Sequence, residues 1–393
     1  MLILYALLVP GSLAKTDDLG RARVLYLGNT VLTSIMSADP TVQAYPVPAY
    51  LFGMKEEDVH RFLRTYMPRT YAGLVDSNDV IYVGDSGVKS YTLAWLGWMS
   101  GGVVEAGMGF VMSGGSESFG GRGNDPSWGD SSVGEVMGVT CNHVVSDSGF
   151  FKPFRLVVQR ADDALMSSLP FETAPRFHYL NMEVFPKIGS VLLATANLPD
   201  NNPAAVVMEA GRGRSLSFMP YITDPNPSVV PFSGWEFYVD FIPNLMLYGA
   251  QAPLPTDYMA AHALRRKING YSELREMALE VLSFAEKLGA NIMDAQARIA
   301  SADGQLAEAK GLYIRKELVA CAELLDQAVA GLEDAGALAI KAKDTAFLWI
   351  YIIEWLAVTC TLMITGAVVW ELMVRRAMLR EAATTRAIHS ASR

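Results

Sequence analysis

The chain has little cysteine and no excess of basic residues, and both deficits exclude classes of function. Only three cysteines occur among 393 residues, Cys141, Cys321 and Cys360. They form neither a CxxC motif nor a Cys/His spacing, so the sequence predicts no zinc or other metal site and no disulfide framework. Its 32 basic and 41 acidic side chains give a net charge of -9. A nucleic-acid partner is therefore not expected.

One long hydrophobic run stands near the C-terminus. Residues 345–370 carry a single charge, Glu354, and at helical rise they exceed a hydrocarbon core of about 30 Å. The run predicts a transmembrane helix over residues 345–374. Two interpretations of Glu354 stay open: a functional carboxylate inside the membrane, or an interfacial side chain if the buried span begins near Trp355.

The two ends of the chain predict its topology. Residues 1–20 read as a signal peptide, because an apolar stretch precedes Ser12-Leu13-Ala14, a small-residue cleavage site. The alternative is a buried first strand. The tail over 375–393 is basic, and by the positive-inside rule it lies in the cytoplasm, which places the larger N-terminal part outside the cell membrane. The opposite topology, a cytosolic domain on a tail anchor, is the competing hypothesis. The arginines of the tail are Arg375, Arg376, Arg380, Arg386 and Arg393.

Residues 21–256 alternate short apolar runs with helical stretches, which predicts an α/β domain with a mostly parallel sheet flanked by helices. Pro253 and Pro255 end it. The expected early elements are strands at Val24–Gly28, Val42–Val47, Val80–Val83 and Gly109–Met112, and helices at Glu56–Tyr66 and Tyr91–Glu105. Later ones are strands at Phe154–Val158 and Ser190–Ala194, a hairpin of Ala205–Glu209 with Ser215–Met219, and a closing amphipathic helix at Trp235–Leu247.

Residues 257–344 contain no Trp and no Pro, and their apolar residues recur every three and four positions. This spacing predicts an α-helical, coiled-coil-type stalk. Gly289, Gly304 and Gly311 interrupt the pattern and favour a folded-back hairpin. The expected partners are the lipid bilayer and either a second copy of the chain or another membrane protein, bound through the stalk and the transmembrane helix.

Several motifs of the α/β domain together resemble the class I glutamine amidotransferase-like superfamily. They resemble most its branch with a Gly-Gly-x-Ser-Phe-Gly-Gly type loop. The resemblance covers roughly residues 22–250 and implies a sheet with flavodoxin-like layers. The motifs are VGDSG at 83–87, GFVMSGGSESFGG at 109–121, WGDSSVGEVMGV at 128–139, GRGRSLSF at 211–218 and the helix Trp235–Leu245.

The resemblance also implies where the site lies. Active members place a cysteine in a Gly-x-Cys-x-Gly elbow and a His-Pro-Glu triplet after a late strand. The matching elbow here is Ser113-Gly114-Gly115, and Met219 and Tyr221 stand where the His and Glu would be. The chain therefore resembles a family whose catalytic Cys and His it lacks, which predicts a pseudoenzyme.

Three interpretations of Ser113 follow. It is a turn residue, or the nucleophile of a serine-dependent hydrolase or amidase with His143 or His178 as base, or part of a ligand site. In the last case the backbone donors of Gly114 to Ser116 bind the ligand.

Two carboxylates join these candidates, Asp85 and Glu117. We interpret Asp85 as an N-cap for residues 86 onward, with ligand binding as the alternative. Cys141 is interpreted as a small core residue. The glycine-rich segment 113–123 lacks a Lys-Ser/Thr pair, so no nucleotide cofactor is predicted. The sequence thus favours a membrane-anchored, non-catalytic binding or assembly module over a hydrolase.

Overall fold

The computed structural model describes residues 15–391 apart from 52, 124, 143–148, 151 and 224–231, and it gives no side-chain environment for 149–150 and 381–391. Most of the predicted signal peptide lies outside the described residues. The chain divides into two compact units. The first joins Met1–Asn269 with Ala307–Leu325, and the second joins Gly270–Leu306 with Asp326–Arg393.

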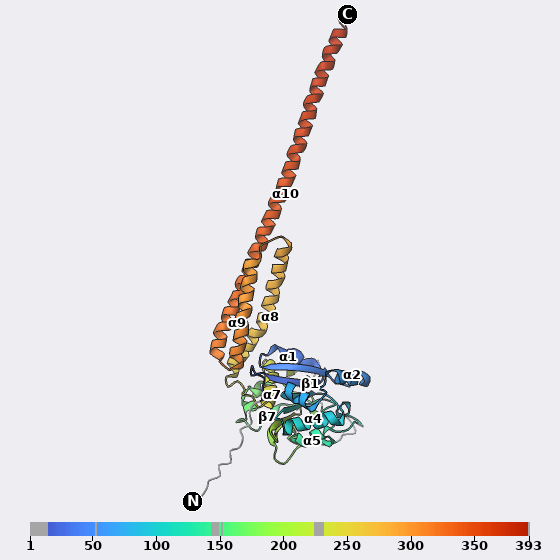
Figure 1. Cartoon of the computed structure of the whole chain (residues 1–393), viewed down its shortest axis with the longest axis vertical. Coiled ribbons are helices and arrows are strands. Elements are labelled where there is room, and N and C mark those ends of the chain that lie inside the picture. The colour runs from blue at the N-terminus through green and yellow to red at the C-terminus, as the bar shows by residue number, and fades with distance from the viewer. Residues whose placement is uncertain are drawn as a thin grey trace. The chain divides into compact units, whose positions relative to one another are not determined.

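An eight-stranded sheet organises the first unit, in the order β2-β1-β3-β4-β12-β11-β10-β7. Strands β2, β1, β3, β4 and β12 run parallel, whereas β11, β10 and β7 extend the sheet in antiparallel fashion. The mostly parallel α/β fold is thereby confirmed (Figure 1). The strands are β1 Ala22–Gly28, β2 Val42–Pro48, β3 Val80–Gly84, β4 Gly109–Ser113, β7 Leu156–Val158, β10 Val191–Ala196, β11 Pro203–Ala210 and β12 Gly213–Phe218.

Short helices and two small two-stranded sheets complete this unit. Every residue of β3 and β4 is buried, as expected for strands covered on both faces. The small sheets pair β5 Val139–Cys141 with β9 Val184–Pro186, and β6 Gly149–Phe150 with β8 Leu180–Asn181. The helices are α1 Thr33–Ala38, α2 Glu56–Tyr66, α3 Tyr71–Ser77, α4 Leu93–Val104, α5 Ser132–Val136, α6 Ala164–Ser167 and α7 Tyr238–Gly249.

Helix α7 differs from the predicted amphipathic helix at Trp235–Leu247. It begins at Tyr238, after a short 3₁₀ turn at Phe232–Gly234, and nearly all of its residues are buried. One side of α7 packs on the central strands. The carboxylate of Asp240, on α7, is covered by Arg265 at 3.0 Å. A helix enclosed on all sides has no polar face, and for that reason the amphipathic prediction was wrong.

Three helices follow the α/β fold: α8 Tyr258–Lys287, α9 Met293–Ile314 and α10 Leu318–Ala391. Gly289 does end a helix, with φ +78°, as predicted. The prediction was wrong for Gly304 and Gly311, which lie inside α9. A helical glycine costs only about 1 kcal/mol relative to alanine, which packing overcomes. The second break comes instead at 315–317, where Lys316 has φ +65°.

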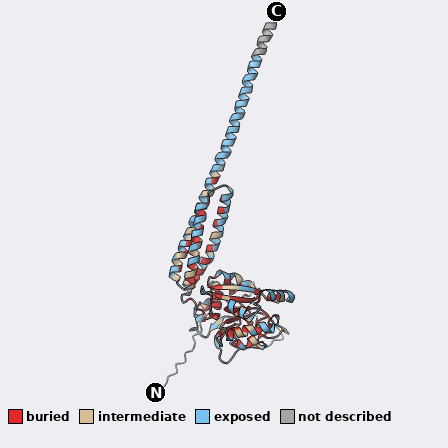
Figure 2. Cartoon of the chain, viewed as in Figure 1, coloured by how far each residue is buried: buried red, intermediate tan, exposed pale blue. Residues whose placement is uncertain are grey.

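In the second unit, α8, α9 and α10 pack together through small and branched side chains such as Ala302, Ala328 and Leu332. From Tyr351 to Arg380, every residue of α10 is exposed (Figure 2). Among the described helices, α10 is long and apolar enough to cross a membrane, and the candidate span covers Leu318–Arg380. Glu354 lies exposed on that stretch.

Candidate functional site

The predicted elbow lies where three parallel strands end side by side. In the sheet register Ser113, the last residue of β4, is level with Gly84 of β3 and Phe218 of β12. Ligands of open α/β sheets bind at this carboxyl edge. Ser113 is nevertheless only 2% exposed.

Two glycines after Ser113 allow the loop to pack tightly against its neighbours. A Cβ on Gly114 would lie 2.0 Å from the carbonyl oxygen of Met219, and one on Gly115 would lie 2.3 Å from Cγ of Asp85. Real Cβ atoms do not approach other atoms so closely. Glycine at both positions is therefore a packing requirement of this turn.

The backbone donors of the loop are engaged within the protein. The Gly114 N–H donates to the carbonyl oxygens of Phe218, at 2.8 Å, and Pro220, at 3.2 Å. The Gly115 N–H donates to Oδ1 of Asn181 at 3.0 Å, and Nδ2 of Asn181 donates back to the Gly115 carbonyl at 3.0 Å. A ligand would have to displace these bonds, so the ligand-binding role of Gly114, Gly115 and Ser116 stays a prediction.

The hydroxyl of Ser113 forms a hydrogen bond with a tyrosine. Its Oγ lies 2.8 Å from the Tyr82 hydroxyl, on the neighbouring strand β3. Burial raises the pKa of Tyr82 well above its usual value of 10. A neutral phenol cannot take the serine proton at physiological pH, so this partner does not activate Ser113.

Neither predicted histidine base is seen to contact Ser113. His143 lies outside the described residues. His178 is 6% exposed, and its Nε2 has no hydrogen-bond partner within the described part of the chain. Its neighbour Tyr179 donates instead to the Gly115 carbonyl at 3.3 Å. Among the described residues, Ser113 is bonded to Tyr82 and not to His178.

Met219 lies beside the elbow, where its carbonyl oxygen packs against Gly114. It directly follows β12, it is fully buried, and its N–H donates to the carbonyl of Ala204 at 2.9 Å. A thioether has no proton to exchange and cannot serve as a base. Tyr221, two residues on, accepts a long hydrogen bond of 3.4 Å from Nδ2 of Asn29.

Asp85 forms a hydrogen bond with the elbow loop and does not cap a helix. The 3₁₀ turn Val88–Ser90 begins after Gly87, and α4 is capped by Thr92. Asp85 has φ +51°, and its Oδ1 accepts the backbone N–H of Glu117 at 2.8 Å. The N-cap interpretation was wrong, because the two partners are 32 positions apart and local sequence patterns do not reveal their contact.

Glu117 in turn reaches the loop after β2. Its Oε2 accepts the N–H of Leu51 at 3.1 Å. Asp85 is 1% and Glu117 5% exposed, so both carboxylates are buried and stabilise the loop. Cys141 is confirmed as a core residue, because it is 4% exposed and burial raises the pKa of its thiol to about 12.

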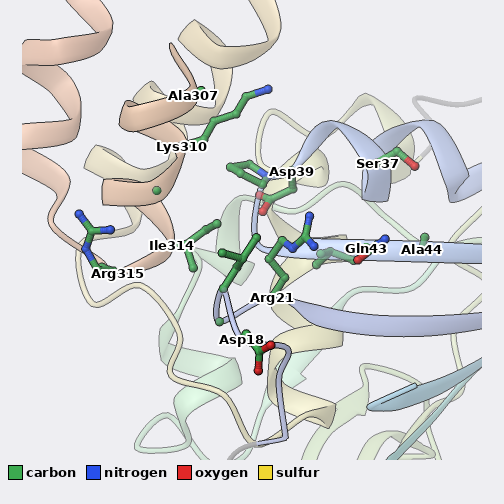
Figure 3. A pocket seen from close by; sticks show the side chains of 15 residues that line it. Asp18, Arg21, Ser37, Asp39, Gln43, Ala44, Ala307, Lys310, Ile314 and Arg315 are labelled. Atoms are coloured by element: carbon green, nitrogen blue, oxygen red, sulfur yellow. The ribbon is translucent and has the colours of Figure 1, made fainter. Parts of the chain in front are cut away.

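A groove lies at the opposite end of the strands from the elbow. Its volume is about 790 Å³, and it is lined by residues that precede β1 and β2, such as Arg21 and Asp39, and by Lys310 and Ile314 of α9 (Figure 3). These are the amino ends of parallel strands, whereas ligands of such sheets bind at the carboxyl ends. The groove is therefore separate from the elbow.

Sequence reasoning missed a buried ionic cluster in the same unit. Arg265 of α8 is 3% exposed, and it pairs with the Asp39 carboxylate and, at 3.0 Å, with Asp240. His262 Nδ1 lies 2.6 Å from the other Asp240 oxygen. Arg265 lies on the apolar stripe of α8. A charged residue at a buried helix position is the sequence signal that could have revealed this cluster.

Lys316 lies close to this cluster. Its ammonium is 5.7 Å from the ring centroid of Tyr313, and its Nζ has no hydrogen-bond partner among the residues that the structure describes. Burial lowers the pKa of Lys316 to about 8, although Asp39 acts in the opposite direction.

The comparison with protein families decides the assignment of the fold. Residues 61–248 match the family model described as "Putative glutamine amidotransferase". This match supports the assignment of the α/β domain to the class I glutamine amidotransferase-like superfamily. The match includes β3, β4 and β12, and so it includes the whole elbow.

The amidotransferase-like domain is also similar in fold to solved structures. The cytoplasmic protein STM3548 from Salmonella typhimurium is 17% identical, with a TM-score of 0.48 over 58% of this chain and 98% of that one. The cytoplasmic protein STM1381 from Salmonella typhimurium LT2 is 18% identical, with a TM-score of 0.46 over 58% and 99%. These likenesses concern the fold alone. No curated protein matches the sequence.

Proposed function

We propose that the protein is a membrane-anchored, non-catalytic amidotransferase-like module that binds or assembles with a partner at the cell surface. The observation that carries the proposal is the environment of Ser113. Its hydroxyl is buried against the neutral phenol of Tyr82, and nearby Met219 is a buried thioether that cannot act as a base. A serine without a base is a poor nucleophile.

The elbow edge is the surface on which we expect a ligand. Tyr50 and Tyr221 lie close enough to Asp85 for its charge to influence both phenols. Burial, together with the Asp85 carboxylate, raises the pKa of both tyrosines above 10. Both phenols therefore stay protonated at neutral pH.

The anchor is the exposed apolar part of α10. Its arginine-rich end supports a cytoplasmic C-terminus and an outward-facing α/β domain. External protease added to intact cells tests this orientation, with a C-terminal tag reporting on the fragment. We expect digestion of the α/β domain and a protected tagged fragment. A domain that survives external protease while the cells remain sealed would support the inverted, cytosolic topology.

A turnover assay separates the binding module from a serine hydrolase. The full-length protein in detergent micelles is incubated with glutamine and with libraries of simple esters and amides. Ser113→Ala is compared with Ser217→Ala, a buried serine on the neighbouring strand β12. We expect no turnover above the buffer rate in any of the three proteins. Turnover that is lost in Ser113→Ala and kept in Ser217→Ala would establish the hydrolase instead.

A further inference from the structure

The turn between α8 and α9 lies against α10 and forms a groove with it inside the second unit. The groove has a volume of about 590 Å³, within the range of small-molecule sites. Its walls are the turn from Leu288 to Ala295 on one side and α10 from Leu338 to Ile353 on the other. It therefore spans the point near Thr345 where the apolar run of α10 begins.

The turn that forms one wall is well determined by its hydrogen bonds. The N–H of Gly289 donates to the carbonyl of Glu286 at 2.8 Å, and the N–H of Ala290 donates to that of Ala285 at 3.1 Å. This is a Schellman motif, with Gly289 at φ +78°. The side chain of Asn291 then accepts the first N–H of α9, from Met293, at 3.2 Å. The wall is thus a closed, hydrogen-bonded corner.

The lining of the groove changes from polar to apolar along α10. Lys341 and Asp294 line its outer part, whereas Trp349, Ile350 and Ile353 line the part that belongs to the apolar run. Neither Lys341 nor Asp294 has an ion-pair partner among the described side chains. From Lys341 to Ile353 is about 18 Å at helical rise, close to the depth of one leaflet with its head groups.

We propose that this groove binds one phospholipid of the membrane that holds α10. The lipid phosphate lies at Lys341, and an acyl chain lies along Trp349, Ile350 and Ile353. Lysine binds a phosphate through a charge-assisted hydrogen bond, and tryptophan prefers the level of the head groups. This inference rests on the proposed membrane anchor, because only an embedded α10 brings lipid to the groove.

Native mass spectrometry of the full-length protein tests the site. The protein is extracted in mild detergent and titrated with palmitoyl-oleoyl phosphatidylethanolamine. Two substitutions target the groove: Ala342→Phe fills it, and Lys341→Gln removes the charge. Their matched controls are Ala337→Phe, on an exposed position outside the groove, and Lys343→Gln, whose lysine pairs with Asp344 at 3.2 Å.

We expect one bound lipid per chain. Occupancy should fall at least tenfold in Ala342→Phe and severalfold in Lys341→Gln, and should be unchanged in both controls. Diacylglycerol, which lacks the phosphate, should not be retained. Equal occupancy in all variants, or equal retention of diacylglycerol, would overturn the proposal. A chain dimer that Ala342→Phe abolishes would also overturn it, since a second copy would then fill the groove.

The native Cys360 distinguishes this failure from failure of the anchor itself. It is an exposed free cysteine near the middle of the apolar run, whereas Cys141 and Cys321 are buried. In sealed vesicles a membrane-impermeant maleimide should leave Cys360 unlabelled. A protected Cys360 without lipid retention would refute the groove site alone. A labelled Cys360 would refute the anchor and the groove together.

Discussion

Removal of the buried ammonium of Lys316 should make the protein more stable at neutral pH. Lys316 lies in the turn between α9 and α10, and burial lowers its pKa from 10.5 to about 8. Lys316→Met keeps the length of the side chain and removes the charge. The φ of +65° at this position is equally unfavourable for both residues, so the backbone strain does not change.

The magnitude follows from the pKa difference. A lowering of about 2.5 pKa units, from 10.5 to 8, corresponds to roughly 3 kcal/mol at 1.36 kcal/mol per unit. The folded state holds fewer protons than the unfolded state between pH 8 and 10.5. The cost is therefore complete below pH 8, and it disappears as the pH rises toward 10.5. The gain in unfolding free energy from Lys316→Met is therefore complete below pH 8 and disappears as the pH rises toward 10.5.

Thermal unfolding of the full-length protein in detergent measures this effect. At about 2–4 °C per kcal/mol, Lys316→Met should raise the Tm by about 6–12 °C at pH 7 and by little above pH 10. Lys310→Met, on the preceding α9, is the matched control and should change the unfolding free energy by at most about 0.5 kcal/mol. An unchanged or lower Tm of Lys316→Met at pH 7, or an equal gain at both pH values, would refute the reasoning.

Three further substitutions test the packing and the elbow. Arg265→Met should lower the unfolding free energy by about 3–5 kcal/mol, because it leaves buried carboxylates without their cation. The control Arg266→Met replaces the exposed neighbouring arginine and should change the unfolding free energy by at most about 0.5 kcal/mol. Equal urea midpoints of the two variants would contradict this prediction. Gly114→Ala should lower the yield and the Tm, because its Cβ would clash with a carbonyl oxygen, whereas Gly270→Ala in open space should be neutral or stabilising by up to about 1 kcal/mol. Ser113→Cys should release no glutamate from glutamine in a coupled assay, and measurable release would show that a base lies within reach.

Much of the fold could be predicted from the sequence because its strands are short, apolar and bounded by turns. The runs at Val80–Gly84 and Gly109–Ser113 are buried over their whole length, so composition alone identifies them. Helix α7 was misjudged because, in addition to the strands, α1, α6 and Arg265 of α8 also contact it. The glycines of α9 were misjudged because glycine disfavours a helix only weakly, and tertiary packing overrides this local preference.

The candidate site was less accessible to sequence reasoning. The position of Ser113 at the end of a parallel strand followed from strand order, and the register places it level with Phe218 of β12. The assignment of Met219 to a catalytic position was implied by the family resemblance alone. The bond between Ser113 and Tyr82 did not follow, because a tyrosine in an apolar strand looks like an ordinary core residue. Arg265 and Asp39 are 226 positions apart in the sequence, and no local pattern joins them.

Covalent labelling of Ser113 tests the central claim most directly, because it requires no knowledge of a substrate. The full-length protein is treated with a serine-reactive fluorophosphonate, and the peptide that contains Ser113 is analysed by mass spectrometry. The hydroxyl is buried and bonded to a neutral phenol, so we predict no adduct at Ser113 in the folded protein. A stoichiometric adduct at Ser113, formed in the folded protein and absent after denaturation, would contradict the account and show an activated nucleophile.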